Sequence, residues 1–348
     1  MRTTTPRFTF GLQNFSGLYL WAMFIVVFGI WKTDLFLTSA TLHSVASSQA
    51  IAAMLALALL IPLTAGVYDL SVGAVINVSA ITVVNLQTMH HVGMWKAMLI
   101  TVVMCAGIGA LSGFIVVRLK VNSFVATLGM ATIVSALQSI ISGQSQPYPP
   151  TDLAWFNLTQ RSVFGFQIVV VYLLVLALLV WWVMDHTPVG RYLYAIGGNN
   201  EAARLSGLKV GRWSWLSLVA SASIAGLAGV FCASLSGPSL TFGQTLLLPA
   251  FAAVFLGSTQ IKPGRFNVWG TLLAVYVLAT GVQGLQFVTG VQWLNDMFNG
   301  VALIAAVAFA GWRQLRPSKQ RLQTSEPATA ERSDPERESL PVPDRVPS

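Results

Sequence analysis

The chain has 348 residues, of which 55% are hydrophobic and only 9% are charged, and its mean hydropathy is +0.68. Half of its 12 acidic residues fall within the last 23 positions, so most of the chain lacks the carboxylates of a solvated surface. These values exclude a soluble globular enzyme, a disordered regulator and a secreted disulfide scaffold. The net charge of +8 does not indicate nucleic-acid binding, because the basic residues stand at the ends of apolar runs.

Ten apolar stretches are candidates for membrane-spanning helices, each of which needs roughly 20 largely apolar residues. In chain order they are 15–31, 42–65, 71–89, 96–117, 124–142, 164–184, 213–235, 245–256, 268–287 and 293–312. The eighth is short for a span. We therefore expect an all-α integral membrane protein with about ten transmembrane helices in two five-helix halves. The halves are inverted relative to each other because five is an odd number.

The basic residues predict the orientation of these helices. With the N-terminus in the cytoplasm, an alternating path places 14 of the first 17 basic residues on the cytoplasmic side, as the positive-inside rule requires. We expect a cytoplasmic N-terminus at 1–14, a membrane domain at 15–312 and a cytoplasmic tail at 313–348. The tail is rich in Pro, Ser, Arg and Glu, a composition typical of disorder.

Small residues at helical spacing indicate where helices approach closely. Gly109 and Gly113 form a GxxxG pair, and Ala225 with Gly229 forms a weaker version of it. Such pairs allow close helix packing in lipid. We favour packing within the chain over a dimer contact at these positions.

A segment between the second and third stretches is broken by Pro and Gly and carries an acidic residue, in Asp69-Leu-Ser-Val-Gly73. The run Ser239-Leu-Thr-Phe-Gly243 resembles it at the corresponding place of the second half, although five positions with three changes leave a chance match open. Broken segments at corresponding places of inverted halves indicate a substrate path in transporters. The candidate path residues are Asp69, Ser71, Asn77, Ser239, Thr241 and Gln244.

Several catalytic motifs are absent from the chain. It contains no G-x-x-x-x-G-K-[ST] loop for nucleotide phosphates, no H-E-x-x-H zinc motif and no G-x-S-x-G nucleophile motif. We expect no catalytic residues, no bound cofactor and no metal in this chain.

The connection 185–212 is the longest loop on the expected cytoplasmic side. Within it, 200–207 predicts a short helix with Asn200 at the N-cap, Glu201 in the first turn and Gly207 as the stop. A short helix of small residues is suited to docking in a groove of a partner. The alternative is an amphipathic linker lying on the membrane.

The run Glu201-Ala-Ala-x-x-x-Gly207 resembles the E-A-A-x-x-x-G signature of bacterial ATP-binding cassette importer permeases. Its surroundings are similar to the ribose and monosaccharide branch of these permeases, as are Asp69-Leu-Ser-Val-Gly73 and Phe124-Val-Ala-Thr-Leu-Gly129. The resemblance extends from about residue 15 to 312, with the motifs in order.

The resemblance implies a type II importer fold and a permease subunit that pairs with a second permease copy or a paralogue. It also implies a cytoplasmic ATP-binding cassette ATPase, which uses ATP and Mg²⁺, and a periplasmic or extracellular sugar-binding protein. By this match Glu201, Ala202, Ala203 and Gly207 couple the permease to the ATPase. The location implied is the bacterial inner membrane, and the function is import of a monosaccharide such as ribose, or of a related solute, by alternating access.

One departure from the sugar branch leaves the substrate open. The branch usually carries a doubled Gly-Gly segment before the ninth helix, which the stretch 256–270 lacks. Two other functions are alternatives. A stand-alone transporter driven by an ion gradient would need no ATPase, and an intramembrane aspartyl hydrolase would need a second carboxylate beside Asp69.

Overall fold

The computed structural model describes residues 16–31, 36–291 and 293–315, and the side chains of the last helix up to residue 308. The predicted N-terminal segment 1–14 lies outside the described residues, as does the tail from 316 onward. Within the described ranges the chain is mostly helical, as expected. Six helical segments are long and apolar enough to cross a membrane: 39–64, 94–118, 123–142, 168–186, 210–236 and 268–289. Four further apolar helices are shorter, at 17–31, 72–88, 242–257 and 293–308.

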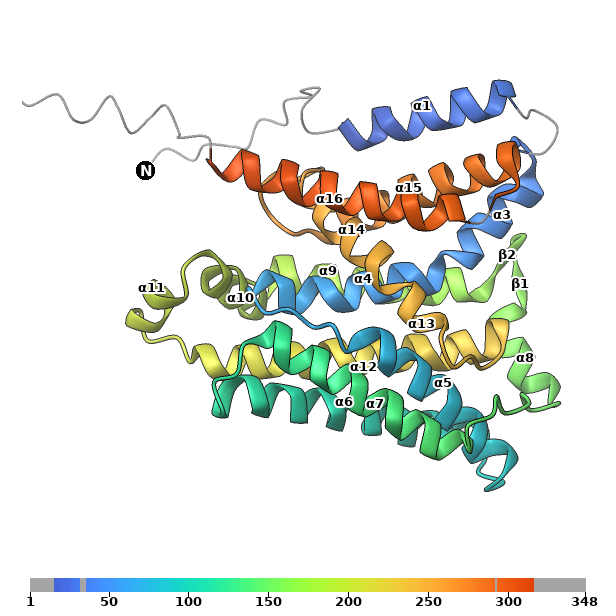
Figure 1. Ribbon diagram of the computed structural model, residues 1–348, viewed down its shortest axis with the longest axis horizontal. Helices are drawn as coiled ribbons and strands as arrows, with labels where there is room; N and C mark the ends of the chain where they lie inside the picture. The colour runs from blue at the N-terminus through green and yellow to red at the C-terminus, as the bar shows by residue number, and fades with distance from the viewer. Residues whose placement is uncertain (1–15, 32–35, 292, 316–348) are drawn as a thin grey trace, which may run out of the picture.

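Figure 1 shows most of the helices running along a common direction, with α11 at one end of the bundle and a small β-hairpin at the other. The elements are α1 Ser16–Trp31, α3 Ser39–Ser48, α4 Ala50–Thr64, α5 Val72–Thr88, α6 Met94–Arg118, α7 Ser123–Ser142, α8 Leu153–Gln160, β1 Ser162–Val163, β2 Phe166–Gln167, α9 Ile168–His186, α10 Pro188–Gly198, α11 Asn200–Leu205, α12 Val210–Ser236, α13 Phe242–Thr245, α14 Leu247–Gly257, α15 Val268–Thr289 and α16 Trp293–Leu315.

The centre of the bundle is formed by α4 and α12, which contact each other. In α4 every residue except Ile61 is buried, because its sequence is apolar on all sides and a helix of that kind belongs in a core. α12 also packs against α5 and α6. The two helices thus form the frame against which the other membrane helices pack.

The small-residue pairs lie in these central contacts. Gly109 of α6 faces the backbone of α12, where an added Cβ would lie 2.6 Å from the Leu218 carbonyl oxygen. Gly229 of α12 faces α5 in the same way, 2.5 Å from the Ile76 carbonyl oxygen. The prediction of packing within the chain is therefore confirmed at both pairs.

A hairpin replaces the start of the sixth predicted stretch. Ser162 pairs with Gln167 and Val163 with Phe166, so the two-residue turn consists of Phe164 and Gly165. Both turn residues have positive φ, +52° and +84°, which is the geometry of a type I′ turn. Helix α9 therefore begins at Ile168 rather than 164, because the hairpin uses the preceding backbone. The short helix α8 before it was not predicted either.

Candidate functional site

The broken segment 65–71 between α4 and α5 is held by side chains of α7. The amide of Tyr68 donates to Ser123 Oγ at 3.1 Å, and the amide of Leu70 donates to Thr127 Oγ1 at 3.0 Å. Irregular backbone in a membrane protein needs such partners, since no water replaces them there. The first turn of α7 therefore stabilises the non-helical geometry of this segment.

Asp69 and Ser71 also stabilise the non-helical geometry of this segment. Both side chains are 1% exposed. The Asp69 carboxylate oxygen Oδ1 accepts a hydrogen bond from the Ser71 amide at 3.1 Å and another from Ser71 Oγ at 2.6 Å. The two residues lie inside the protein beside the candidate path, and their polar atoms are engaged in a local turn.

The second broken segment, which includes α13, is tied to α5 by Asn77. The Asn77 Oδ1 atom accepts from the Gly243 amide at 2.6 Å, and its Nδ2 donates to the Leu240 carbonyl at 3.1 Å. Gln138 of α7 donates to the same carbonyl at 2.9 Å. A single buried amide therefore ties α5, the helix that follows the first broken segment, to the second broken segment.

The two segments contact each other at their last glycines. A Cβ added to Gly73 would lie 2.8 Å from the Gly243 carbonyl oxygen, and a Cβ added to Gly243 would collide with the Gly73 carbonyl oxygen. Only glycine permits this approach of two backbones. The runs Asp69–Gly73 and Ser239–Gly243 are thus brought together in space, as a shared path requires.

A cavity of about 380 Å³ opens beside this contact, between α5, α7 and the second broken segment. Among the six candidate path residues, Gln244 lines it, and its Nε2 donates to Ser135 Oγ at 3.3 Å. Thr132 of α7 lines it too. Sequence reasoning missed Thr132 and Ser135, although the spacing of three between these polar residues in an apolar helix was a usable signal.

The remaining two candidates, Ser239 and Thr241, lie in the loop before α13. Ser239 is half-buried and Thr241 is exposed. The Ser239 Oγ accepts from the amides of Thr241 at 3.3 Å and Phe242 at 3.2 Å. Ser239 therefore stabilises the start of α13, while Thr241 faces outward.

At the other candidate site, the predicted short helix is present as α11. Its N-cap is Asn199, one residue earlier than predicted, because the Asn199 Oδ1 accepts from the Ala202 amide at 3.0 Å. Gly207 ends it with a φ of +83°, and its amide donates to the Arg204 carbonyl at 3.0 Å. A left-handed glycine after the last turn is a common helix stop.

The four predicted coupling residues differ in their exposure. Ala203 is 5% exposed and packs inward, whereas Glu201, Ala202 and Gly207 are exposed. Glu201 forms an ion pair with Arg204 at 3.3 Å, and both side chains are about 70% exposed. A pair this open contributes little to stability, so the Glu201 carboxylate remains accessible to a partner.

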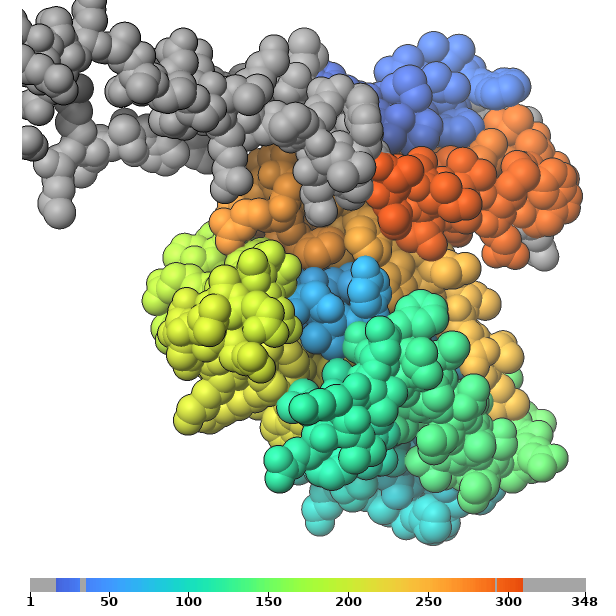
Figure 2. Space-filling view, turned by 60° about the vertical axis from the view of Figure 1, so that its left-hand side comes forward, coloured from blue at the N-terminus to red at the C-terminus, as the bar shows by residue number. Residues whose placement is uncertain are grey.

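Helix α10 joins α11 to the first broken segment. It buries Gly190, Leu193 and Ile196, and an added Cβ at Gly197 would collide with the carbonyl oxygen of Thr64, the last residue of α4. Figure 2 shows the yellow-green surface of α10 and α11 beside the blue surface around the end of α4. Sequence reasoning did not separate α10 from α11, although Pro188 at its first position was a start signal.

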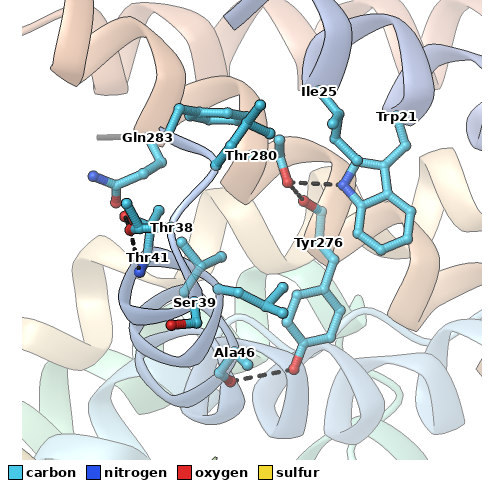
Figure 3. A pocket seen from close by; sticks show the side chains of 13 residues that line it. Trp21, Ile25, Thr38, Ser39, Thr41, Ala46, Tyr276, Thr280 and Gln283 are labelled. Atoms are coloured by element: carbon cyan, nitrogen blue, oxygen red, sulfur yellow. Dashed lines mark hydrogen bonds between the residues drawn. The ribbon is translucent and has the colours of Figure 1, made fainter. Parts of the chain in front are cut away.

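A different cavity, of about 590 Å³, lies between α1, the 36–46 segment and α15 (Figure 3). Trp21 Nε1 donates to Thr280 Oγ1 at 2.9 Å, and the Tyr276 hydroxyl donates to the Ala46 carbonyl at 3.3 Å. None of the predicted site residues lines it. These bonds join α1 and α3 to the rest of the bundle.

The protein is a bundle of apolar helices in which two broken segments meet, and a small exposed helix lies at one end. These are features of a membrane transport subunit. The family described as "Branched-chain amino acid transport system / permease component" matches residues 41–307. The match covers more than half of the chain, and the chain belongs to this family.

Similar proteins with assigned substrates lie within the same family of importers. A fructose import permease protein of Rhizobium meliloti is 32% identical over 304 residues, covering 83% of this chain and 82% of the relative. The ribose import permease protein of Escherichia coli strain K12 is 29% identical over 282 residues, covering 78% and 86%. The D-allose transport system permease protein of that strain is 25% identical over 304 residues, covering 86% and 93%.

One solved structure, PsaBC from Streptococcus pneumoniae in complex with Fab, is similar with a TM-score of 0.41 and 15% identity, covering 86% of this chain and 97% of that one. A similarity this low carries no argument here.

The chain is therefore the permease subunit of an ATP-binding cassette importer, a multi-pass membrane protein that is not itself an enzyme. The predicted function is confirmed at this level. Membership of the family implies a separate ATPase and a substrate-binding protein as partners.

Proposed function

We propose that this permease imports a sugar, namely a monosaccharide such as ribose or a closely related solute. The observation that carries the proposal is similarity over about four fifths of the chain to permeases named for fructose, ribose and D-allose. Polar groups beside the broken segments, such as Gln244 and Ser135, are of the kind that hydrogen-bond to sugar hydroxyls.

We also propose ten membrane-spanning helices in two inverted halves. The packing supports this arrangement, because the main contacts of α4, α5, α6 and α7 are repeated when these helices are exchanged for their counterparts α12, α14, α15 and α16. α12 packs on α5 and α6 as α4 packs on α14 and α15, and α5 packs on α6 and α7 as α14 packs on α15 and α16. The backbone contact of Gly73 with Gly243 lies where an axis between the halves would pass.

The translocation path is proposed to follow the two broken segments and to be completed by a second permease copy or a paralogue. Exposed polar residues on apolar helices are unfavourable in lipid, and Thr132, Thr241 and Gln244 are exposed in the single chain. A partner permease would cover them. In this scheme Asp69, Ser71, Asn77 and Ser239 keep the segments in shape, while Thr241 and Gln244 face the solute.

The ATPase is proposed to drive transport by acting on α11. Glu201, Ala202 and Gly207 would contact the cytoplasmic ATPase, with Ala203 anchoring the helix from below. ATP and Mg²⁺ would bind to the ATPase alone. Both termini would then be cytoplasmic, and the β-hairpin would face the periplasmic or extracellular binding protein.

Reconstitution tests this function directly. The permease is placed in proteoliposomes with the ATPase and the binding protein encoded beside it, and uptake of radiolabelled ribose, fructose and allose is measured. We expect uptake of at least one sugar that requires ATP, the ATPase and the binding protein together. Uptake driven by a proton or sodium gradient without the ATPase would instead establish a secondary transporter.

A further inference from the structure

A polar cavity of about 570 Å³ lies where the end of α9, helix α10, the turn 258–267 and the start of α15 meet. Three Arg or Lys residues line it, together with His186 and one acidic residue, Asp185; the three are Arg191, Lys262 and Arg265. Trp181 and Trp269 line the same cavity. None of these residues belongs to the proposed path or to the exposed face of α11.

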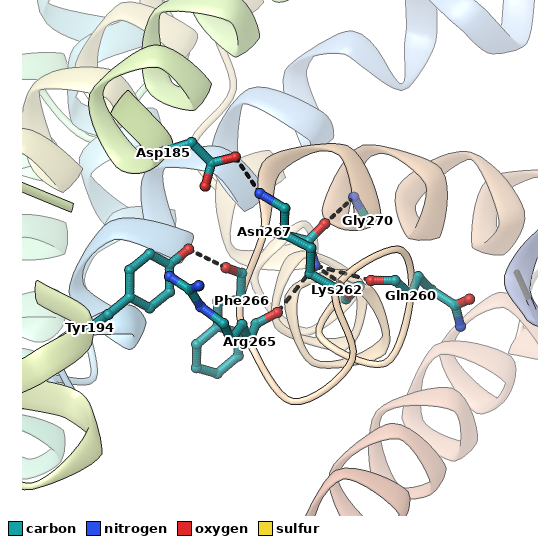
Figure 4. A network of polar contacts seen from close by, with 9 residues as sticks. Asp185, Tyr194, Gln260, Lys262, Arg265, Phe266, Asn267 and Gly270 are labelled. Atoms are coloured by element: carbon teal, nitrogen blue, oxygen red, sulfur yellow. Dashed lines mark hydrogen bonds and ion pairs between the residues drawn. The ribbon is translucent and has the colours of Figure 1, made fainter. Parts of the chain in front are cut away.

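The turn that carries two of the basic residues is firmly held (Figure 4). The buried amide of Asn267 donates to the carbonyl of Gln260 at 3.1 Å and accepts from the Gly270 amide at 2.7 Å. The Tyr194 hydroxyl donates to the Phe266 carbonyl at 2.5 Å. Burial raises the pKa of Tyr194, with a smaller opposing effect of Arg265, so this phenol remains a donor at neutral pH.

The charges of the cavity do not balance. Lys262 Nζ lies 2.6 Å from Asp185 Oδ2, so these two charges form an ion pair. The Arg265 guanidinium lies over the Tyr194 ring, 4.0 Å from its centroid. Within the described ranges, neither Arg265 nor Arg191 has a carboxylate within ion-pair distance. Two positive charges therefore line the cavity without a negative partner.

We propose that this cavity binds the phosphate group of an anionic phospholipid. Guanidinium groups match phosphate oxygens in geometry and charge, and basic pockets between membrane helices on the cytoplasmic side take lipid headgroups of this kind. Trp181 and Trp269 are suited to the glycerol region, because tryptophan prefers the boundary between lipid and water. The volume lies within the range of roughly 300–1,000 Å³ typical of small-molecule sites.

Lipid titration of the purified full chain in detergent tests the inference. Phosphatidylglycerol and phosphatidylcholine are added at matched mole fractions, and bound lipid is counted by native mass spectrometry alongside the melting temperature. We expect preferential binding of phosphatidylglycerol, weakened about fivefold by Arg191→Gln and by Arg265→Gln, since one basic residue near a membrane contributes roughly 1 kcal/mol. Arg118→Gln, which alters an exposed basic residue outside the cavity, should bind as the original chain does.

Two further arms identify the source of the phosphate. Inorganic phosphate at equal ionic strength should not raise the melting temperature as phosphatidylglycerol does. If it does, the site binds free phosphate and the lipid assignment fails. Equal loss of binding in Arg118→Gln would mean general surface attraction and would also overturn the proposal. If Arg265→Gln unfolds because its contact with Tyr194 is lost, Arg191→Gln decides alone, since within the described part Arg191 makes neither an ion pair nor a cation–π contact.

Discussion

At the scale of single residues, the feature that defines the candidate path is the contact between Gly73 and Gly243. The two backbones approach so closely that neither glycine has room for a methyl group. Beside this contact, the Gly243 backbone amide donates a hydrogen bond to the buried Asn77 side chain. Neither glycine has an unusual φ, so close approach rather than backbone conformation requires glycine here.

Gly243→Ala should therefore be poorly tolerated. The new methyl group would meet the Gly73 carbonyl oxygen and lie 2.8 Å from Asn77 Oδ1, and overpacking of this kind costs about 1–3 kcal/mol. We expect a lower melting temperature in detergent and loss of most uptake in proteoliposomes. The control is Gly129→Ala in α7, where nothing lies within 4 Å of the added carbon. Unchanged stability and uptake in Gly243→Ala would remove this contact from the site.

The sequence identified these residues only in part. It indicated both broken segments and Asn77, because a polar or acidic residue in an apolar setting is visible in the letters alone. It could not indicate that Ser123 and Thr127 satisfy the backbone of the first segment, since that pairing depends on how α7 crosses α5. Nor could it distinguish buried Asp69 from cavity-lining Gln244, because both lie in similar polar runs.

At the scale of elements, α11 combines a buried residue with an exposed surface. Its one inward side chain, Ala203, is small, so the helix rests close to the body of the protein. Leu205 on its last turn is 84% exposed.

Glu201→Lys should uncouple the permease without unfolding it. The carboxylate is 71% exposed and its ion pair with Arg204 is open to solvent, so its loss should change stability by less than about 1 kcal/mol. We expect normal insertion and melting temperature, loss of ATP-dependent uptake, and weaker co-purification of the ATPase. Gly207→Trp should act in the same direction by altering the helix stop.

Lys209→Gln is the matched control, since it changes an exposed charge just beyond α11. Both that variant and the original chain should retain the ATPase. Transport at the original rate in Glu201→Lys would show that Glu201 has no part in coupling.

Helix positions were largely predictable, and helix details were not. Predicted stretches such as 71–89 and 124–142 agree with α5 and α7 to within one residue at each end, because long apolar runs define them. The break between α3 and α4 at Gln49 was missed, as was the hairpin at 162–167. The break falls in the polar run Ser47-Ser48-Gln49, and the hairpin depends on a two-residue turn whose positive φ values an apolar pattern does not reveal.

At the scale of the whole molecule, the bundle has two unlike ends, with α11 at one and the hairpin at the other (Figure 1). The distribution of basic residues in the sequence predicts which end faces the cytoplasm. The direction in which the bundle crosses the membrane can be measured.

Cysteine labelling measures this orientation. The two native cysteines, Cys105 and Cys232, are buried and should not react with a membrane-impermeant maleimide. Tyr148→Cys introduces a thiol at a site that is 88% exposed, and it should be labelled in intact spheroplasts. Ser206→Cys, exposed beside α11, should be labelled only after permeabilisation. The reverse pattern would contradict the proposed topology.

The contact of Gly197 with Thr64 has a mechanical consequence. The carbonyl of Thr64 meets the backbone of α10 directly at Gly197, so no side chain lies between α10 and the end of α4 at this point. Side chains can turn aside and absorb a small displacement, whereas two backbones in contact must move together. A displacement of α10 toward α4 would therefore bear directly on Thr64 and on the broken segment that follows it.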